Sequence, residues 1–345
     1  KESGEVSFII SADDGSRLFI DGEEVYSEWH NGATREKMYN LNAVKGKAYK
    51  VVLEYFQAGG EASLKFDIGI KKEINYKEVA DKAAEADVII FVGGLSSALE
   101  GEEMPVDLPG FRKGDRTNID LPQVQEEMLK ALKKTGKPVV FVLCSGSTLA
   151  LPWEAENLDA IIEAWYPGQQ GGTAVADVLF GDYNPAGRLP LTYYKSLDEL
   201  PPFDDYDITK GRTYKYFKGD VLYPFGYGLS YSSFTYSDLQ VKDGVGEVTV
   251  SFRLKNTGKR NGDEVAQVYV RIPETGGIVP LKELKGFRRV PLKSGESRRV
   301  EIKLNKEQLR YWDVEKGQFV VPKGAFDVMV GASSKDIRLQ TVIDL

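Results

Sequence analysis

Residues 86–121, ADVIIFVGGLSSALEGEEMPVDLPGFRKGDRTNIDL, contain the features that decide the fold. The stretch opens with an uninterrupted apolar run over 88–92, which is too short for a typical helix and is rich in β-branched residues. Such a run predicts a strand buried on both faces, and strands of that kind belong to parallel sheets. We therefore expect this part of the chain to form an α/β layer.

The segment that follows this strand is rich in acidic residues. It begins at Gly93-Gly94, has no hydrophobic period, and carries Glu100, Glu102, Glu103, Asp107 and Asp115. Ligands of open α/β sheets bind beyond the carboxyl ends of the strands, so these carboxylates lie where chemistry is common. Two interpretations remain open. The acids either keep an exposed loop soluble, or they include a general acid/base whose protonation is set by its neighbours.

The composition limits the chemistry that the chain can perform. Its 345 residues are enough for two or three domains, and a net charge of -7 argues against a nucleic-acid partner. No apolar run reaches the roughly 18 residues that a membrane span needs. His30 and Cys144 are the only histidine and cysteine, which excludes metal sites built on His and Cys clusters. A Ser-His-Asp or Cys-His system would have to use His30, and its position in an apparent loop far from the α/β part argues against one. Catalysis must therefore use carboxylates, tyrosines or lysines, and we expect neither a cofactor nor a metal.

Hydrophobic periodicity divides the chain into three regions. Residues 1–72 contain short β-prone runs separated by Asp-Gly, Asn-Gly and Gly-Gly turns, which predicts an all-β fold. Residues 73–233 alternate between strand and helix patterns, which predicts an α/β sandwich with a mostly parallel sheet. Alternating strands return over 234–345 and predict a second β-sandwich. The expected fold class is multidomain, with the α/β part between a β-sandwich fragment and a complete β-sandwich.

The individual elements can be placed by residue number. In the first region we expect strands over 6–10, 17–20, 49–55 and 63–68. In the second region we expect strands over 88–92, 138–144 and 160–164, and helices over 76–86, 124–134 and 172–180.

The acidic segment also carries a motif. The string Glu100-Gly101-Glu102-Glu103-Met104, followed by Gly114-Asp115-Arg116 and Leu121-Pro122-Gln123, resembles the acid/base loop of glycoside hydrolase family 3. Matched position by position, the resemblance puts the acid/base on Glu102, with Glu100 and Glu103 as alternative registers. Asp115 and Arg116 would support the loop, although Arg116 fits a surface ion pair equally well. The resemblance continues through 168–188, 211–216, 223–231 and 281–290, which read GQQGGTAVADVLFGDYNPAGR, GRTYKY, YPFGYGLSY and LKELKGFRRV.

The resemblance gives each region an expected identity. Residues 1–72, through the string SADDGSRLFIDG, are similar to part of the protective-antigen-like β-sandwich that is inserted in some members of the family. Residues 73–233 resemble the family's α/β-sandwich domain, and residues 234–345 resemble its fibronectin type III-like domain. Asp13-Asp14 matches a calcium-binding pair of related adhesins, but an Asp-Asp-Gly turn needs no metal to explain it.

The family's catalytic nucleophile has no counterpart in this chain. In the family it is an aspartate, usually in a Ser-Asp-Trp context, on an N-terminal (β/α)8 barrel of roughly 250 residues. We therefore expect the chain to be the C-terminal portion of a longer, retaining and exo-acting β-glycosidase, inactive without its barrel. The implied substrates are oligosaccharides with terminal β-D-xylosyl or β-D-glucosyl residues. The resemblance also implies a secreted or periplasmic protein and allows a homodimer. The alternative for the isolated chain is a non-catalytic carbohydrate-binding or structural module.

Overall fold

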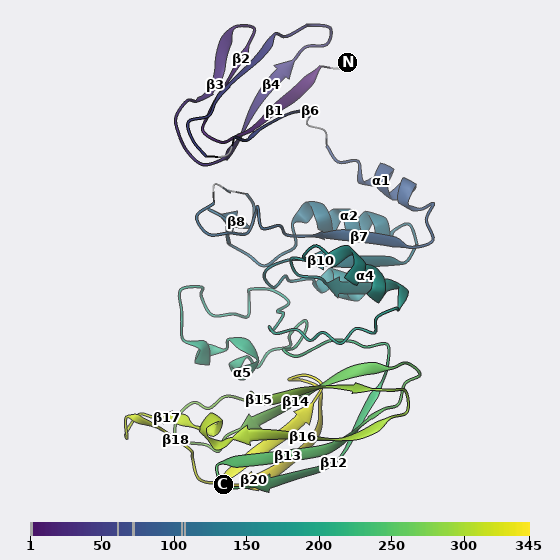
Figure 1. The fold of residues 1–345 in the computed structure, drawn as a ribbon, viewed down its shortest axis with the longest axis vertical. Coiled ribbons are helices and arrows are strands. Elements are labelled where there is room, and N and C mark those ends of the chain that lie inside the picture. The colour runs from purple at the N-terminus through teal and green to yellow at the C-terminus, as the bar shows by residue number, and fades with distance from the viewer. Residues whose placement is uncertain (1–2, 61, 71–72, 105, 107) are drawn as a thin grey trace. The chain divides into compact units, whose positions relative to one another are not determined.

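The computed structural model describes residues 3–60, 62–70, 73–104, 106 and 108–345. Asp107, one of the acids of the predicted loop, lies outside the described residues. The chain forms two compact units, Lys1–Asn75 and Tyr76–Leu345, which Figure 1 draws in order from purple to yellow. Within the described ranges, no helix is long and apolar enough to span a membrane.

The first unit is a β-sandwich of two antiparallel three-stranded sheets. One sheet has the order β4-β1-β6 and the other β3-β2-β5. Their strands are β1 Gly4–Ala12, β2 Gly15–Ile20, β3 Glu23–Glu28, β4 Arg35–Ala43, β5 Val51–Phe56 and β6 Leu64–Ile70. The two central strands face each other and form the core through Phe8, Ile10, Leu18 and Ile20, all nearly inaccessible to solvent. The sequence did not predict β3 and β4, because both are rich in charged residues.

The turn at Asp14 is held by its own side chain. Asp14 has a left-handed backbone, with a φ of 60°. Its carboxylate accepts hydrogen bonds from the backbone N–H groups of Gly32, Ala58 and Gly59, at 3.0, 2.6 and 3.3 Å. These donors, Ala58 above all, lower the pKa of Asp14. Backbone amides therefore supply the contacts that fix this Asp-Asp-Gly turn, as the turn interpretation requires.

The second unit begins with a three-stranded parallel sheet of order β11-β10-β7. The strands are β7 Ile89–Gly94, β10 Val139–Cys144 and β11 Ala160–Glu163, and the helices between them are α1 Tyr76–Ala83, α2 Gln123–Lys133, α3 Pro152–Asn157 and α4 Gly171–Phe180. Helices α1 and α2 cover one face, because Ala80, Leu129 and Leu132 share a buried cluster with Val139 and Phe141 of the central strand. The strands and long helices lie close to their predicted positions.

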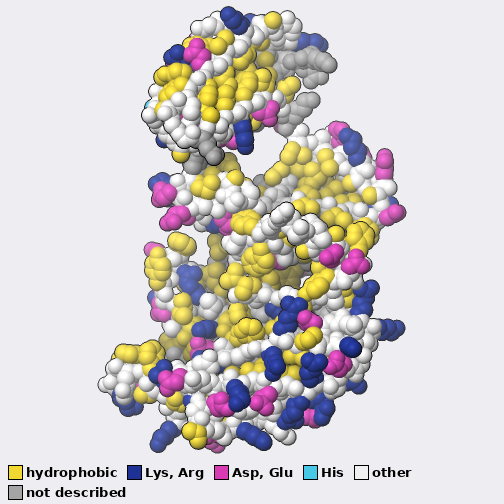
Figure 2. Space-filling view, in the orientation of Figure 1, with side chains coloured by type: hydrophobic (Ala, Val, Ile, Leu, Met, Phe, Trp, Pro, Cys, Tyr) yellow, Lys and Arg dark blue, Asp and Glu magenta, His cyan; other side chains and the backbone are white. Residues whose placement is uncertain are grey.

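One face of β7 is open to solvent. Ile89 is 8% exposed, whereas Ile90 and Val92, which point to the other side of the sheet, are 48% and 64% exposed. Helix α4 has no buried residue, so it gives this face little cover. The prediction that the 88–92 run is buried on both faces is therefore wrong. Figure 2 shows hydrophobic side chains gathered on the visible surface of both units.

An irregular segment, residues 182–233, links the sheet to the C-terminal sandwich. It contains the short helices η1 Ile208–Lys210 and α5 Thr213–Tyr216, and Figure 1 shows it between the two layers of the second unit. Buried aromatic rings hold it in place. Tyr193 is 2% exposed, and Tyr214 stacks on Phe225 with ring centroids 4.3 Å apart. Aromatic packing of this kind substitutes for the regular hydrogen bonding that the segment lacks.

The C-terminal part is a β-sandwich with sheets of order β12-β13-β16 and β15-β14-β19-β20. Its strands are β12 Phe234–Asp243, β13 Glu247–Asn256, β14 Gly262–Arg271, β15 Glu283–Leu292, β16 Ser297–Asn305, β19 Ala325–Gly331 and β20 Ile337–Asp344, with η2 Lys306–Leu309 and the small hairpin β17 Tyr311–Asp313 and β18 Gln318–Val320 beside them. Phe252 on β13, Val268 on β14 and Phe326 on β19 are fully buried in one shared core. The alternation of apolar and polar residues from residue 234 onward places these apolar side chains on the inward-facing side of each strand.

A partly buried acid, Glu163, ties the irregular segment to the sheet. It is the last residue of β11, and its carboxylate accepts hydrogen bonds from the Tyr193 hydroxyl at 2.8 Å and from the Trp165 backbone N–H at 3.0 Å. Burial raises the pKa of Glu163 to about 7, because the charged form loses its hydration. Burial also raises the pKa of Tyr193, which keeps that hydroxyl a neutral donor.

We predict that Glu163 makes the stability of the chain fall as the pH rises. Its pKa is raised from an ordinary 4.5 to about 7, so the folded state binds the proton more tightly than the unfolded state and stability is lost between those values. Glu163→Gln should remove this loss. Urea unfolding at pH 5 and pH 8 should show a smaller difference in the variant than in the parent chain. An unchanged difference would contradict the prediction.

We predict that Phe141→Ala lowers the free energy of unfolding of the second unit by about 3 to 5 kcal/mol. Phe141 is fully buried at the centre of β10, so its removal leaves a cavity beneath α2. Val245→Ala, at a fully exposed position, is the matched control and should have no measurable effect. Urea unfolding of both variants checks the prediction, and equal effects would contradict it.

Candidate active site

The loop after β7 leaves the sheet at a fixed point. Gly94 has a φ of 117°, and a Cβ there would collide with the carbonyl oxygen of Cys144, so the position requires glycine. The Gln125 side chain on α2 accepts a hydrogen bond from the Gly94 N–H at 2.6 Å and donates one to the Gly94 carbonyl at 2.7 Å. The Leu95 N–H donates to the Cys144 carbonyl at 2.7 Å. The first residues of the loop are thereby held against both α2 and β10.

A small hairpin folds back on the acidic part of the loop. Its strands are β8 Phe111–Arg112 and β9 Asp115–Arg116, joined by Lys113 and Gly114, which both have positive φ as in a type I′ turn. A Cβ at Gly114 would collide with the carbonyl oxygen of Gly101. The Met104 N–H donates to the Lys113 carbonyl at 2.9 Å. The hairpin, which the sequence did not predict, therefore packs directly against the Glu-rich string.

The Glu100 carboxylate is the meeting point of this region. Its Oε2 accepts a hydrogen bond from the Tyr166 hydroxyl at 2.7 Å, and its Oε1 accepts one from the Ser147 hydroxyl. Arg116 Nη1 lies 3.8 Å from the same Oε1, and the Glu100 side chain is only 15% exposed. Ser147 follows β10 and Tyr166 follows β11, so segments that leave all three strands at their carboxyl ends converge on one carboxylate.

Ser147 and Tyr166 were not found from the sequence. The usable signal was their position, since each comes within three residues of the end of a predicted parallel strand. Tyr166 is a stable donor, because burial and the neighbouring Glu100 raise the pKa of its hydroxyl to about 12.

Arg116 lies within the loop rather than on an open surface. Its side chain is 13% exposed, and it donates hydrogen bonds to the Ser147 hydroxyl at 3.3 Å and to the Asp120 carbonyl at 3.2 Å. The guanidinium carbon sits 5.3 Å from the centre of the Phe111 ring. Burial lowers the pKa of Arg116, and the attraction of Glu100 opposes that shift. The side chain links the hairpin to the Glu100 carboxylate.

The other predicted site residues point away from this cluster of contacts. Glu102 is exposed and makes no hydrogen bond or ion pair with any residue that the structure describes. Glu103 has a φ of 52° and lies 3.5 Å from the Lys113 ammonium, with both side chains largely exposed. Asp115 is exposed on β9. The structure therefore brings Glu100 and Arg116 together and leaves Glu102, Glu103 and Asp115 at the surface of the loop.

The arrangement suits proton transfer at the rim of a sheet. It presents one carboxylate fixed by hydroxyl and guanidinium donors and a second, Glu102, free to meet a solute from solvent. In the described part of the chain, no group of three or more His, Cys, Asp or Glu side chains is placed to hold a metal ion. Carboxylate chemistry is what this loop can offer.

Two family models match the chain. The Glycosyl hydrolase family 3 C-terminal domain matches residues 12–231, and the Fibronectin type III-like domain matches residues 264–334. The first match runs from the end of β1 through the α/β layer to the irregular segment, and the second lies within the C-terminal sandwich.

Proteins of known sequence or structure are similar to most or all of this chain. A xylan 1,4-beta-xylosidase of Xylanibacter ruminicola is 43% identical over 99% of this chain, which spans 40% of that protein. A periplasmic beta-glucosidase of Salmonella typhimurium is 38% identical over 76% of this chain, which spans 35% of that protein. The crystal structure of a beta-glucosidase from Kluyveromyces marxianus matches all of this chain and 43% of its own, with 31% identity and a TM-score of 0.81. The chain belongs to glycosyl hydrolase family 3 and spans less than half the length of these relatives.

Proposed function

We propose that this chain supplies the general acid/base of a retaining, exo-acting β-glycosidase. Its substrates would be oligosaccharides with terminal, non-reducing β-D-xylosyl or β-D-glucosyl residues. The observation that carries the proposal is the convergence of Ser147, Tyr166 and Arg116 on the Glu100 carboxylate at the carboxyl end of the parallel sheet. Relatives named as xylosidases and glucosidases support both substrate classes.

The loop offers two glutamates for proton transfer. In double displacement, a protonated carboxyl gives its proton to the leaving oxygen and, once ionised, takes a proton from water. Glu102 is the donor that the motif favours, and its exposed side chain is free to reach an incoming glycosidic oxygen. Glu100 is the donor that positioning favours, because a catalytic carboxyl must be held at a defined place. If Glu102 is the donor, Glu100 anchors the loop beneath it.

The nucleophile of this reaction would come from further polypeptide. A retaining glycosidase needs a second carboxylate about 5 to 5.5 Å from the first. We propose that an N-terminal (β/α)8 barrel, in the same chain or in another, provides it. The lengths of the relatives support this, and so does the exposed apolar face of β7, which is typical of a surface that other residues cover. Secretion or export to the periplasm, and a homodimer, belong to the same proposal, with the periplasmic relative as support for export.

A non-catalytic carbohydrate-binding or structural module is the second candidate for the chain by itself. In sequence order the chain has one β-sandwich before its α/β layer and one after it, and the sandwich fold hosts many functions besides catalysis.

We predict that the purified 345-residue chain will not hydrolyse nitrophenyl β-xyloside or nitrophenyl β-glucoside. The chain offers an acid/base but no partner nucleophile, so the first displacement cannot occur. Release of nitrophenol is measured beside a version of the protein that includes the barrel. That longer protein should turn over one or both substrates, and their ratio assigns it as a xylosidase or a glucosidase. Turnover by the 345-residue chain would contradict the missing-nucleophile argument.

We predict that Glu→Gln at the proton donor lowers kcat of the barrel-containing protein by about 10²- to 10⁴-fold on substrates with poor leaving groups. Activated leaving groups need less protonation, so the loss on them should be smaller, and azide should restore part of the rate by replacing the base step. Glu100→Gln and Glu102→Gln are compared, with Glu103→Gln as a matched control in the same loop.

The two variants are distinguished by rescue. In the variant that removes the proton donor, the rate rises with added azide and depends on the leaving group. In a variant that only loosens the loop, KM rises and azide does not change the rate. Full activity in both Glu100→Gln and Glu102→Gln would move the role to Glu103, and full activity in Glu103→Gln as well would remove the acid/base from these glutamates.

A further inference from the structure

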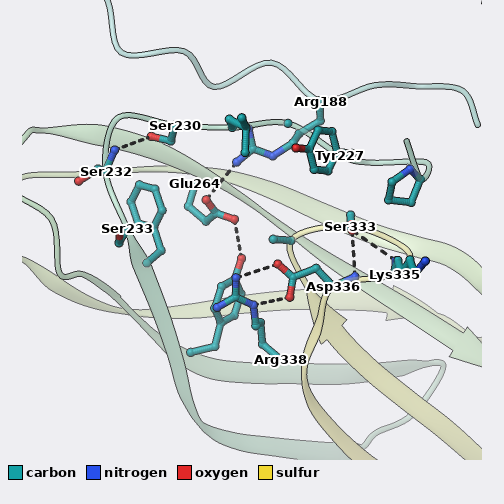
Figure 3. A pocket seen from close by; sticks show the side chains of 16 residues that line it. Arg188, Tyr227, Ser230, Ser232, Ser233, Glu264, Ser333, Lys335, Asp336 and Arg338 are labelled. Atoms are coloured by element: carbon teal, nitrogen blue, oxygen red, sulfur yellow. Dashed lines mark hydrogen bonds and ion pairs between the residues drawn. The ribbon is translucent and has the colours of Figure 1, made fainter. Parts of the chain in front are cut away.

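An open pocket of about 560 Å³ lies where the C-terminal sandwich meets the end of the irregular segment. Figure 3 shows its lining, which comes from four places in the sequence: Arg188, the stretch 224–236, Glu264, and the turn between β19 and β20 with its flanking residues. A volume of this size is typical of small-molecule sites. None of the lining residues belongs to the loop that carries Glu100 and Glu102.

The floor of the pocket is a buried acid with both oxygens occupied. Glu264 on β14 is 3% exposed, and it accepts hydrogen bonds from Arg188 Nη2 at 3.0 Å and from the Tyr236 hydroxyl at 2.7 Å. Arg188 is itself only 9% exposed at its side chain. This contact joins the irregular segment to two strands of the sandwich, so the pocket is held by the fold on both sides.

One wall carries a second charged pair that solvent can reach. The Asp336 carboxylate accepts two hydrogen bonds from the Arg338 guanidinium, at 2.5 and 2.7 Å, and both side chains are almost half exposed. Lys335, also on this wall, pairs with Asp220 outside the pocket. The Arg188–Glu264 and Asp336–Arg338 pairs are each neutral, and Lys335 shares Asp220 with Lys195, so little net charge is left in the lining to attract an ion.

The opposite wall is aromatic and apolar. Tyr227 stacks on Tyr223 with ring centroids 5.2 Å apart, which fixes the orientation of its ring. The Tyr227 hydroxyl makes no hydrogen bond with another of the described residues. Leu229 at the rim is 71% exposed. Paired charges on one side and an oriented ring on the other fit a ligand that has many hydroxyl groups and an apolar C–H face.

We propose that this pocket binds a neutral sugar ring, apart from any catalytic step. The exposed Asp336–Arg338 pair supplies adjacent acceptors and donors for neighbouring hydroxyls. The Tyr227 ring covers the C–H face, and its hydroxyl supplies a further hydrogen bond. Such a site would keep an oligosaccharide chain close to the protein between encounters with a catalytic centre.

Isothermal titration of the 345-residue chain with xylobiose and cellobiose tests the proposal. Ser233→Trp should abolish binding, because residue 233 is exposed and lines the pocket, so a large side chain there fills it without removing a buried group. Asp336→Asn should weaken binding about tenfold or more by removing a charged acceptor. Asp243→Asn is the matched control, an aspartate paired with Lys306 outside the pocket, and should bind like the parent chain.

Each outcome decides between a sugar site and its alternatives. Absence of disaccharide binding, or binding that Ser233→Trp leaves unchanged, overturns the proposal. Binding of inorganic phosphate that Ser233→Trp abolishes, without disaccharide binding, shows an anion site and also overturns it. Disaccharide binding that depends on residue 233 and survives Glu100→Gln and Glu102→Gln supports the proposal independently of the acid/base assignment.

Discussion

The hydrogen bonds at the Glu100 carboxylate are the constraint on which the long loop after β7 depends. The loop has no hydrophobic period, and its described regular structure is one hairpin of two-residue strands, so ordering it costs conformational entropy. Leu95 and Phe111 pack in the core cluster, and the contacts of Glu100 hold the acidic part between them. Tyr166, Ser147 and Arg116 reach the carboxylate from three separate segments, and the largely buried β10, paired with β11, holds two of those segments in register. The site is therefore as rigid as the sheet beneath it.

A similar arrangement of hydrogen bonds is found at two other acids, one partly buried and one buried. Glu163 and Glu264, like Glu100, each accept a hydrogen bond from a tyrosine hydroxyl, at 2.8 and 2.7 Å, and each tyrosine comes from a different part of the chain. Tyrosine combines an apolar ring with a neutral donor, so it can cross a packed boundary and still satisfy a carboxylate. Glu100 and Glu264 also have an arginine nearby, whereas Glu163 contacts no cation in the described structure, and its pKa is raised to about 7.

The sequence predicted the strands and helices that depend on the local pattern of apolar residues. Apolar runs located the three parallel strands, and periodic stretches located α1, α2 and α4. Strands β3 and β4 were missed because their exposed faces are charged, and the β8–β9 hairpin because a lysine at positive φ gives no turn signal. Ser147 and Tyr166, two of the partners of Glu100, lie 47 and 66 residues away, so no pattern within the loop itself finds them. The prediction that β7 is buried on both faces failed because burial depends on the neighbouring elements and not on the strand's own sequence.

The uncovered side of β7 has a practical consequence for handling this polypeptide. In the sheet, β7 has β10 on one edge and no described strand on the other, where the Gln125 side chain bonds only to Gly94 at the end of the strand. The exposed side chains of Ile90 and Val92 form an apolar surface next to that unpaired edge. In concentrated solution the β7 edges of two copies of the chain can pair with each other. Such aggregates would bury surfaces that are exposed in a single copy. Light scattering on each preparation should therefore come before any titration is interpreted.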